Sequence, residues 1–378
     1  MRIGAISALL VLMACSPAAA PVADKTAAAP PAEPWTLQAV TPDTTDGIRI
    51  LVMHDMEGLS GQNDPNTYFF GQPEYPHGQE LLAGDVNAVV EGLYQGGATE
   101  VEVVDAHGSG NPDPDVRADL LDKRAKQVFR DTEFDPYVDL VAPKAYDAVA
   151  VVAMHAKTGS HGFASHTYTI GIGLQMNGQA ITETELVGLS YGRQGIPVIF
   201  GSGDNKLAQD LAGMNWIEFV TVKNATAADS AELRPIPEAR ADLTAHAKKA
   251  VENLRAGKTQ AMKIGLPMTA GVKAVPPASL EMLDGVPGIN YKDSTVTFTA
   301  DSLSQAYAAQ LKLIRLATSA YQRHIQRAIM EDPAARKLVM PKMLGTISRI
   351  WFDVESGRWK APPPPPPAAA GHKYHGDQ

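Results

Sequence analysis

The sequence predicts an α/β fold, with a mostly parallel sheet, flanking helices and a second, smaller α/β lobe. Short Val-rich apolar runs alternate with segments whose apolar residues recur at helical spacing. Buried runs of this kind are typical of parallel strands covered by helices. In addition, three of the predicted strands end in acidic or histidine residues, and α/β sheets bind ligands at the carboxyl ends of their strands.

The first predicted lobe, residues 47–220, is the candidate catalytic domain. Its helix at 78–97 carries six apolar residues at helical spacing and stops at a Gly-Gly pair, which is a common helix C-terminus. In chain order the predicted elements are a strand at 48–54, a helix at 78–97, strands at 99–107 and 146–155, a helix at 182–195 and a strand at 196–204.

The second predicted lobe comprises residues 221–330. It contains an amphipathic helix at 237–257, an alternating strand at 294–300 and a long helix at 301–330, with Asp301 or Ser302 as its N-cap. Residues 331–378 are predicted to be a C-terminal extension that ends in a polyproline tail.

The first 15 residues predict export. Arg2 precedes an apolar run of signal-peptide length, too short to span a bilayer as a mature helix. Residues 12–15, Leu-Met-Ala-Cys, resemble a lipobox, in which Cys15 becomes the lipidated first residue; plain secretory cleavage after the next Ala-rich stretch is the alternative. Cys15 is the only cysteine. We therefore expect an exported protein of the bacterial envelope, periplasmic or lipid-anchored at Cys15.

Residues 16–46 are rich in Ala and Pro and are predicted to be a tether, because they cannot bury a core. The net charge of −9 argues against a nucleic-acid partner. No apolar run after residue 15 is long enough for a transmembrane helix, so we expect membrane contact through Cys15 alone.

Acidic and histidine residues follow three predicted strands. Asp55 and Glu57 follow the first, Asp105 and His107 end the second, and His155 ends the third. Carboxyl ends of parallel strands meet at one edge of a sheet. Carboxylates with imidazoles, and no cysteine, suit zinc, manganese or cobalt, and two metals can share a bridging carboxylate and activate a water. The sequence therefore predicts a hydrolytic metal site.

A second motif favours a different chemistry. Residues 188–192, GLSYG, match the G-x-S-x-G of serine hydrolases, a motif that needs a strand before the serine and a helix after it. The preceding residues are polar and helical in pattern. A serine hydrolase that uses Ser190 is therefore the weaker alternative.

Four segments occur in the order of a known family: HDMEGLSG (54–61), VVDAHGSGN (103–111), MHAKTGSHGFASHT (154–167) and MNGQAITETELVGLSYGRQGIPVIFGSGD (176–204). Together they resemble the zinc D-aminopeptidases of the DppA type, peptidase family M55. The stretch from DGVPG to LKLI (284–314) resembles the family's closing region, so the resemblance covers about residues 47–320.

The resemblance implies two zinc ions per chain, with manganese or cobalt as alternatives, and a bridging role for Asp55. Glu185 lies two residues after the implied ligand Glu183, and the family's glycines around it are missing here, so the choice between the two stays open. The implied ligands are Asp55, Glu57, His107, His155 and Glu183.

The resemblance also matches His166 to the family's catalytic nucleophile. A role as general base or as donor to the oxyanion is the chemical alternative. Asp105 and Asp204 are candidates to receive the substrate's α-amine, with ordinary structural roles as the alternative. We expect His54 to pack or to support a ligand and His161 to be exposed.

The implied function is that of a metal-dependent aminopeptidase that removes N-terminal residues, D-amino acids such as D-Ala, from short peptides. A homo-oligomer, decameric by the resemblance, is also implied. The alternative from a different class is a non-catalytic, metal-dependent peptide-binding lipoprotein. Retention of all five ligands and of His166 argues against it, because a binding protein needs no base or nucleophile.

Overall fold

The computed structural model describes residues 33–43, 45–128 and 146–361. The predicted signal segment, most of the predicted tether and the polyproline tail lie outside these residues. Among the helices that are described, none combines the length and the apolar character needed to cross a membrane.

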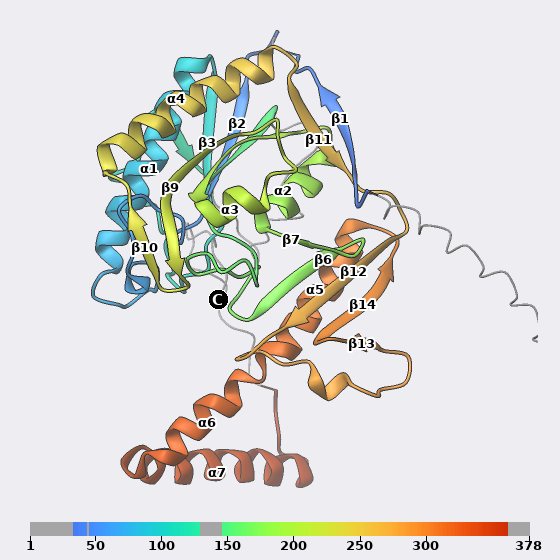
Figure 1. The fold of residues 1–378 in the computed structure, drawn as a ribbon. Helices are drawn as coiled ribbons and strands as arrows, with labels where there is room; N and C mark the ends of the chain where they lie inside the picture. The colour runs from blue at the N-terminus through green and yellow to red at the C-terminus, as the bar shows by residue number, and fades with distance from the viewer. Residues whose placement is uncertain (1–32, 44, 129–145, 362–378) are drawn as a thin grey trace, which may run out of the picture. The chain divides into compact units, whose positions relative to one another are not determined.

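A seven-stranded sheet forms the centre of the fold (Figure 1), in the order β10-β9-β8-β5-β2-β3-β4. Every neighbouring pair is parallel except the hairpin of β9 and β10. The predicted α/β fold with a mostly parallel sheet is therefore confirmed. The strands are β2 (Arg49–His54), β3 (Glu100–Asp105), β4 (Ala125–Gln127), β5 (Ala148–Met154), β8 (Val198–Asp204), β9 (Glu218–Ala227) and β10 (Ser230–Leu233).

Helices cover both faces of this sheet. Alternate residues of a strand point to opposite faces: Ile50 and Val52 join the core under α1 (Tyr75–Gly96) and α4 (Ile236–Arg255), whereas Leu51 and Met53 join the core on the other face, with α2 (Glu183–Gly192) and α3 (Asn205–Asp210). The helices α1 and α4 touch closely at Gly92, where a Cβ atom would lie 2.2 Å from the Thr244 carbonyl oxygen.

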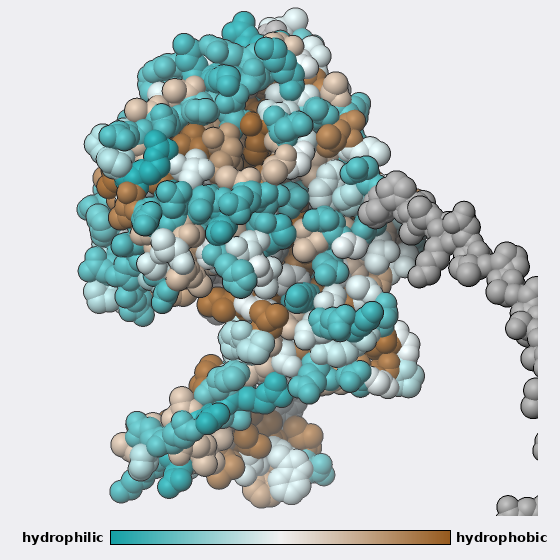
Figure 2. All heavy atoms as spheres, viewed as in Figure 1, coloured by the Kyte–Doolittle hydropathy of each residue, from teal (hydrophilic) through white to brown (hydrophobic). Residues whose placement is uncertain are grey.

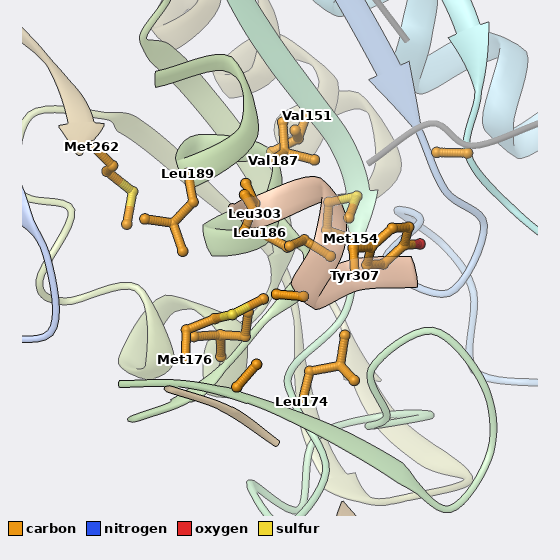
Figure 3. Close-up of a cluster of buried hydrophobic side chains, with 14 of the residues drawn as sticks. Val151, Met154, Leu174, Met176, Leu186, Val187, Leu189, Met262, Leu303 and Tyr307 are labelled. Atoms are coloured by element: carbon orange, nitrogen blue, oxygen red, sulfur yellow. The ribbon is translucent and has the colours of Figure 1, made fainter. Parts of the chain in front are cut away.

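A five-stranded antiparallel sheet, in the order β13-β14-β12-β6-β7, lies on the far side of α2. Figure 3 shows side chains from β5, α2, β6 and α5 (Leu303–Thr318) meeting between the two sheets. The strands are β6 (Ile172–Met176), β7 (Gln179–Ile181), β12 (Met268–Ala274), β13 (Asn290–Lys292) and β14 (Thr295–Ala300).

The division of the chain into domains at residue 220 stays a prediction. The strands of the two sheets, however, are not partitioned there: β6 and β7 precede residue 220 but lie in the five-stranded sheet, while β10 follows it and belongs to the seven-stranded sheet, against which α4 packs. Two short 3₁₀ helices, η1 (Pro65–Thr67) and η2 (Glu281–Leu283), lie in connecting loops.

Two expectations for the ends of the body are wrong. The tether was expected to reach residue 46, but β1 (Thr36–Val40) pairs with β11 (Thr259–Lys263). The helix expected at 301–330 is two helices, α5, capped by Ser302, and α6 (Tyr321–Glu331). The Ser319 hydroxyl donates to the Leu316 carbonyl at 2.6 Å, and side-chain hydroxyls of this kind compete with helical hydrogen bonds. A further helix, α7 (Pro333–Glu355), follows within the C-terminal extension.

Asp85 connects α1, α4 and the loop after β2. Its carboxylate accepts a hydrogen bond from the Ser60 N–H at 2.7 Å and lies 2.9 Å from the Arg240 Nε. Burial raises the pKa of Asp85 even though these partners favour its charged form.

Replacing Arg240 with Met should lower the free energy of unfolding by about 2–3 kcal/mol at pH 8, because a buried carboxylate loses its cation. The raised pKa means that the folded state holds the Asp85 proton more tightly than the unfolded chain does. The loss should therefore grow as pH rises and be smaller at pH 5. Urea unfolding at both pH values measures it. Lys248→Met, which breaks an exposed pair with Glu252 on the same helix, is the control. If Arg240→Met lowered the free energy of unfolding equally at both pH values, the role of the Asp85 charge would be contradicted.

Candidate metal centre

Three adjacent strands, β3, β2 and β5, bring most of the predicted ligands to one edge of the sheet. Asp55 and Glu57 follow β2, His107 follows β3, and His155 follows β5 directly. Glu183 reaches the same place as the first residue of α2. All five side chains are buried, although charged groups are normally solvated, so their burial at one point demands a partner charge.

The backbone at the end of β5 is adapted to this site. Ala153 has a φ of +60°, and the pairing of β5 with β8 is irregular between Val151 and Met154. A non-glycine residue in the left-handed region is uncommon and tends to occur at functional sites. The Ala153 carbonyl accepts the Gly58 N–H at 2.7 Å. A Cβ atom on Gly58 would lie 2.1 Å from the Met154 carbonyl oxygen, so the loop of Asp55 and Glu57 can sit this close only with glycine.

The five side chains form two groups that share Asp55. One group contains Asp55, Glu57 and His107, and the other contains Asp55, His155 and Glu183; in each, one donor atom per residue lies within 4.8 Å of the others. The His107 Nε2 is 3.4 Å from Glu57 Oε1, and the His155 Nε2 is 3.3 Å from Asp55 Oδ2. A carboxylate common to both groups has the two oxygens that a bridging ligand needs.

Both imidazoles are oriented through the ring nitrogen that faces away from Asp55, Glu57 and Glu183. The His107 Nδ1 lies 2.7 Å from Asp115 Oδ2, and the His155 Nδ1 lies 3.1 Å from the Ala156 carbonyl oxygen. Because carboxylate and carbonyl oxygens accept, Nδ1 carries a proton, and Nε2 is the nitrogen left to bind a metal ion. This is the usual arrangement of metal-binding histidines.

The donor set fits divalent metal ions. The His155 Nε2 is buried and makes no well-formed hydrogen bond with the residues that the structure describes. Three carboxylates and two imidazoles without sulfur are the ligands that zinc, manganese and cobalt accept. Such an ion would satisfy both the buried nitrogen and the buried carboxylates.

The electrostatics lead to the same conclusion. Burial raises the pKa of Asp55, and the charge of Glu57 raises it further. Burial opposes charge on His155, yet the carboxylates of Glu183 and Asp55 raise its pKa well above the usual value. The same holds for His107, between Glu57 and Asp115. The cluster is thus strongly negative and attracts positive charge, which a proton or a metal ion can supply.

His166 lies beside the two groups and, with Glu57 and His155, forms a third group whose donor atoms lie within 4.8 Å of one another. Its ring stacks on that of His155, with centroids 3.9 Å apart. Its Nδ1 lies 2.6 Å from the Ala164 carbonyl oxygen and therefore carries the proton, while Nε2 is 4.0 Å from Glu57 Oε1. Burial, followed by the charge of His155, lowers the pKa of His166. Its Nε2 is therefore an available base.

A cavity of about 300 Å³ opens at this point. Glu57, His107 and His166 line it, and aromatic rings form part of its wall. The Tyr68 ring packs edge-on against that of His107, with centroids 6.2 Å apart. Burial and the nearby charge of Glu57 raise the pKa of Tyr68, so its hydroxyl keeps its proton and can donate. The remaining lining residues include Phe69, Tyr168 and Ile170.

The other candidates from the sequence have structural contacts. Glu185 closes the capping box of α2, accepting the Thr182 N–H at 2.7 Å, so of the two glutamates Glu183 alone joins the cluster. Asp105 accepts the N–H groups of His107 and Asp115 at 2.9 and 2.6 Å.

Asp204 caps α3 and also accepts the Phe163 N–H at 2.8 Å. Neither Asp105 nor Asp204 lines the cavity among its described residues. His54 is buried, with Nδ1 3.9 Å from Asp105 Oδ1, and His161 is exposed. Ser190 lies in the last turn of α2, without the strand-to-helix turn that a serine nucleophile requires.

Sequence reasoning missed two supporting residues. Asp115 orients His107 and is held by the Ser109 hydroxyl at 2.6 Å. Lys223 is fully buried; its Nζ donates to the Glu57 carbonyl at 2.6 Å and to Gln62 Oε1 at 2.7 Å. Burial lowers the pKa of Lys223 to about 7. A lysine directly after the run Phe-Val-Thr-Val (219–222) of β9 was the one signal of this contact in the sequence.

Replacing Asp115 with Asn should weaken metal binding about 10- to 100-fold, the usual effect of losing a partner that orients a ligand. The amide keeps the size of the carboxylate but removes the charge that stabilises the His107 proton on Nδ1. Titration with zinc under a competing chelator measures the affinity. Asp113→Asn, an exposed change on the same loop, should leave it unaltered, and equal affinities in both variants would contradict the role of Asp115.

Buried carboxylates and imidazoles at the carboxyl edge of an α/β sheet, with a base beside an open cavity, define a metal-dependent hydrolase. The chain belongs to peptidase family M55: the family profile, described as D-aminopeptidase, matches residues 48–311. The predicted family and the predicted class of enzyme, a metal-dependent D-aminopeptidase, are thereby confirmed.

Two matches, one of sequence and one of structure, each span most of the chain. A D-aminopeptidase of Bacillus subtilis (strain 168) is 22% identical over 288 residues, which are 71% of this chain and 98% of that protein. A solved structure, described as the Zn-dependent D-aminopeptidase DppA from Bacillus subtilis, a self-compartmentalizing protease, has a TM-score of 0.64 at 21% identity. It covers 72% of this chain and 98% of its own. This likeness confirms the fold.

Proposed function

We propose that the protein binds two zinc ions, one in each group, and removes N-terminal D-amino acids such as D-Ala from short peptides. The observation that carries the proposal is the pair of buried ligand groups that share Asp55 beside a cavity. The zinc dependence of the Bacillus subtilis relative supports the choice of metal. Manganese and cobalt accept the same donors.

The ions, when bound, would polarise the scissile carbonyl and lower the pKa of a water. The chain's own residues supply the proton transfers. His166 Nε2 takes a proton from the attacking water and returns it to the leaving amine, while its Nδ1–H stays fixed on the Ala164 carbonyl. We therefore assign His166 as general base, in preference to the nucleophile of the family resemblance.

The cavity determines how the substrate is held. Glu57 is the carboxylate among its described lining residues, so the substrate's α-amine lies toward Glu57, which replaces Asp105 and Asp204 as the candidate. The Tyr68 hydroxyl is placed to donate to a polar group of the peptide. The aromatic wall excludes water, which strengthens these interactions.

Assembly and location are also proposed. We propose a homo-oligomer, supported by the description of the relative as self-compartmentalizing. More specifically, we propose a decamer, as the family resemblance implies. Export and lipid attachment at Cys15 rest on the first 15 residues alone. An exported D-aminopeptidase would meet peptides that contain D-residues, such as cell-wall fragments.

Purification without chelator, followed by measurement of metal per chain and of hydrolysis of D-Ala and L-Ala p-nitroanilide, tests the proposal. We expect about two zinc ions per chain and chelator-sensitive turnover that favours the D substrate. Metal without turnover on any peptide would favour the non-catalytic binding alternative. Chelator-resistant turnover that Ser190→Ala abolishes would favour the serine hydrolase.

A further inference from the structure

The helices α6 and α7 form a hairpin beyond the part of the chain that the family profile matches, residues 48–311. The two helices contact each other. No residue of α7 is buried by the part of the chain that the structure describes. Hydrophobic side chains are correspondingly visible on this hairpin in Figure 2. A helix with this many exposed apolar side chains normally requires a partner.

The apolar residues of α7 follow a heptad spacing. Beyond Pro341, apolar side chains occur at intervals of four, three and four residues, at positions 343, 347, 350 and 354. Leu344 and Trp351 lie next to this row of apolar side chains and widen it. We call these six residues the α7 stripe, and their exposed fractions range from 36% to 58%: Met343, Leu344, Ile347, Ile350, Trp351 and Val354.

This spacing favours another helix as the partner. Apolar residues at alternating intervals of three and four form the seam by which two helices pack, knobs into holes. A lipid surface needs an apolar face but no such seam, and it favours cations along the whole opposite face. The α7 helix does not provide them, because its last three residues include the carboxylates of Asp353 and Glu355.

The charges of α7 favour a second copy in antiparallel orientation. The first half of the helix carries Arg336, Lys337 and Lys342 and no acidic residue, whereas the second half carries two carboxylates and one arginine. Antiparallel pairing about residues 348 and 349 places Lys342 of each helix opposite the partner's Glu355, whereas Arg336 and Lys337 lie beyond the paired residues. Parallel pairing would place the three cationic residues of one helix against the same three residues of the other.

We propose that α7 is a self-association surface, which pairs antiparallel with α7 of a second copy of this chain. The twofold axis passes near residues 348 and 349, at the middle of the stripe. Ile347 then packs against the partner's Ile350, and Met343 against the partner's Val354. Such an interface is isologous and closes at two chains. It is independent of the metal centre and of any other contact between copies.

Cross-linking tests the pairing and its direction, because Cys15 is the only cysteine. In the full chain carrying Cys15→Ser, Met343→Cys and Val354→Cys are made separately, with different tags, and mixed under mild oxidation. We expect the mixed disulfide to exceed each homodisulfide at least fivefold. Predominant homodisulfides, or no disulfide above that of an exposed control, Ser356→Cys with Thr346→Cys, would overturn the proposal.

Sedimentation of the same full chain measures the strength of association. Ile347→Lys should weaken the association of two copies through α7 at least tenfold, because it places a charge in the middle of the seam. Thr346→Lys adds the same charge one residue away, outside the stripe, and should change it less than threefold. Equal effects of the two variants would overturn the proposal.

A membrane partner gives a different result. If the protein sediments with vesicles that contain phosphatidylglycerol, loses this binding in Ile347→Lys and forms no mixed disulfide, the stripe serves a lipid surface and the proposal fails. Neither readout depends on turnover. An enzyme with no D-aminopeptidase activity could still form the mixed disulfide, so this proposal and the proposed function fail separately.

Discussion

Replacing Asp55 with Asn should remove most of the bound metal and lower the rate of hydrolysis at least about a thousandfold, equivalent to about 4 kcal/mol of transition-state stabilisation. Asp55 is the residue that both ligand groups share, so one substitution weakens both. The amide has nearly the size of the carboxylate but only one oxygen and no charge. It can still accept the Met56 N–H, as Asp55 Oδ1 does at 2.9 Å.

Unfolding should not explain this loss. Burial and the neighbouring Glu57 raise the pKa of Asp55, so removing its charge relieves repulsion in the metal-free protein. The metal-free variant should therefore unfold at a temperature no lower than that of the metal-free wild type. Elemental analysis gives the metal content, and p-nitroanilide turnover gives the rate. Asp64→Asn, on the same loop but outside both groups, is the control. Wild-type metal content in the Asp55 variant would contradict the assignment of Asp55 as a bridging ligand.

Replacing His166 with Phe should lower kcat about 10²- to 10⁴-fold, the usual contribution of a general base, while the metal content stays unchanged. A phenyl ring keeps the stacking contact with His155, at a centroid distance of 3.9 Å, but has no nitrogen. The two outcomes together separate a proton-transfer role from a ligand role, since loss of a ligand would lower the metal content as well.

The pH profile provides a second readout for His166. Burial, followed by the charge of His155, lowers its pKa, and the neutral imidazole is the active form. Activity should therefore be present above this pKa and fall as pH drops through it, below the ordinary histidine value of about 6.5. The acid limb should be absent in His166→Phe. His161→Phe, an exposed change in the same loop, should keep it. An unchanged acid limb in His166→Phe would exclude His166 as the base.

The residues at the strand ends could be predicted because a parallel sheet brings all its carboxyl ends to one edge. Asp55, His107 and His155 were found by that rule and by the family resemblance, and the structure places them together. Glu183 and Glu185 could not be separated, because both lie in the first turn of α2. The capping box with Thr182 decides their geometry, and it depends on side-chain direction.

Other parts of the molecule could not be predicted for physical reasons. Pro341 and Gly345 interrupt the pattern of α7, and both residues disfavour helix interiors. The contacts of Lys223 join residues more than 160 positions apart, which no local pattern records. The separation of α5 from α6 reflects hydrogen bonds of Ser319 and of the Ala317 carbonyl, which also accepts the Ser279 N–H at 3.1 Å.

The first residue of α6 contacts a residue of the cavity wall. The Tyr321 hydroxyl donates to the carbonyl oxygen of Ile170, and Ile170 lines the cavity. Tyr321 lies outside the stretch matched by the family profile. Mutations at the start of α6 can therefore reshape the substrate wall while every ligand stays intact. Selection could change the preferred peptide in one lineage through α6, while the chemistry of the metal centre stays the same.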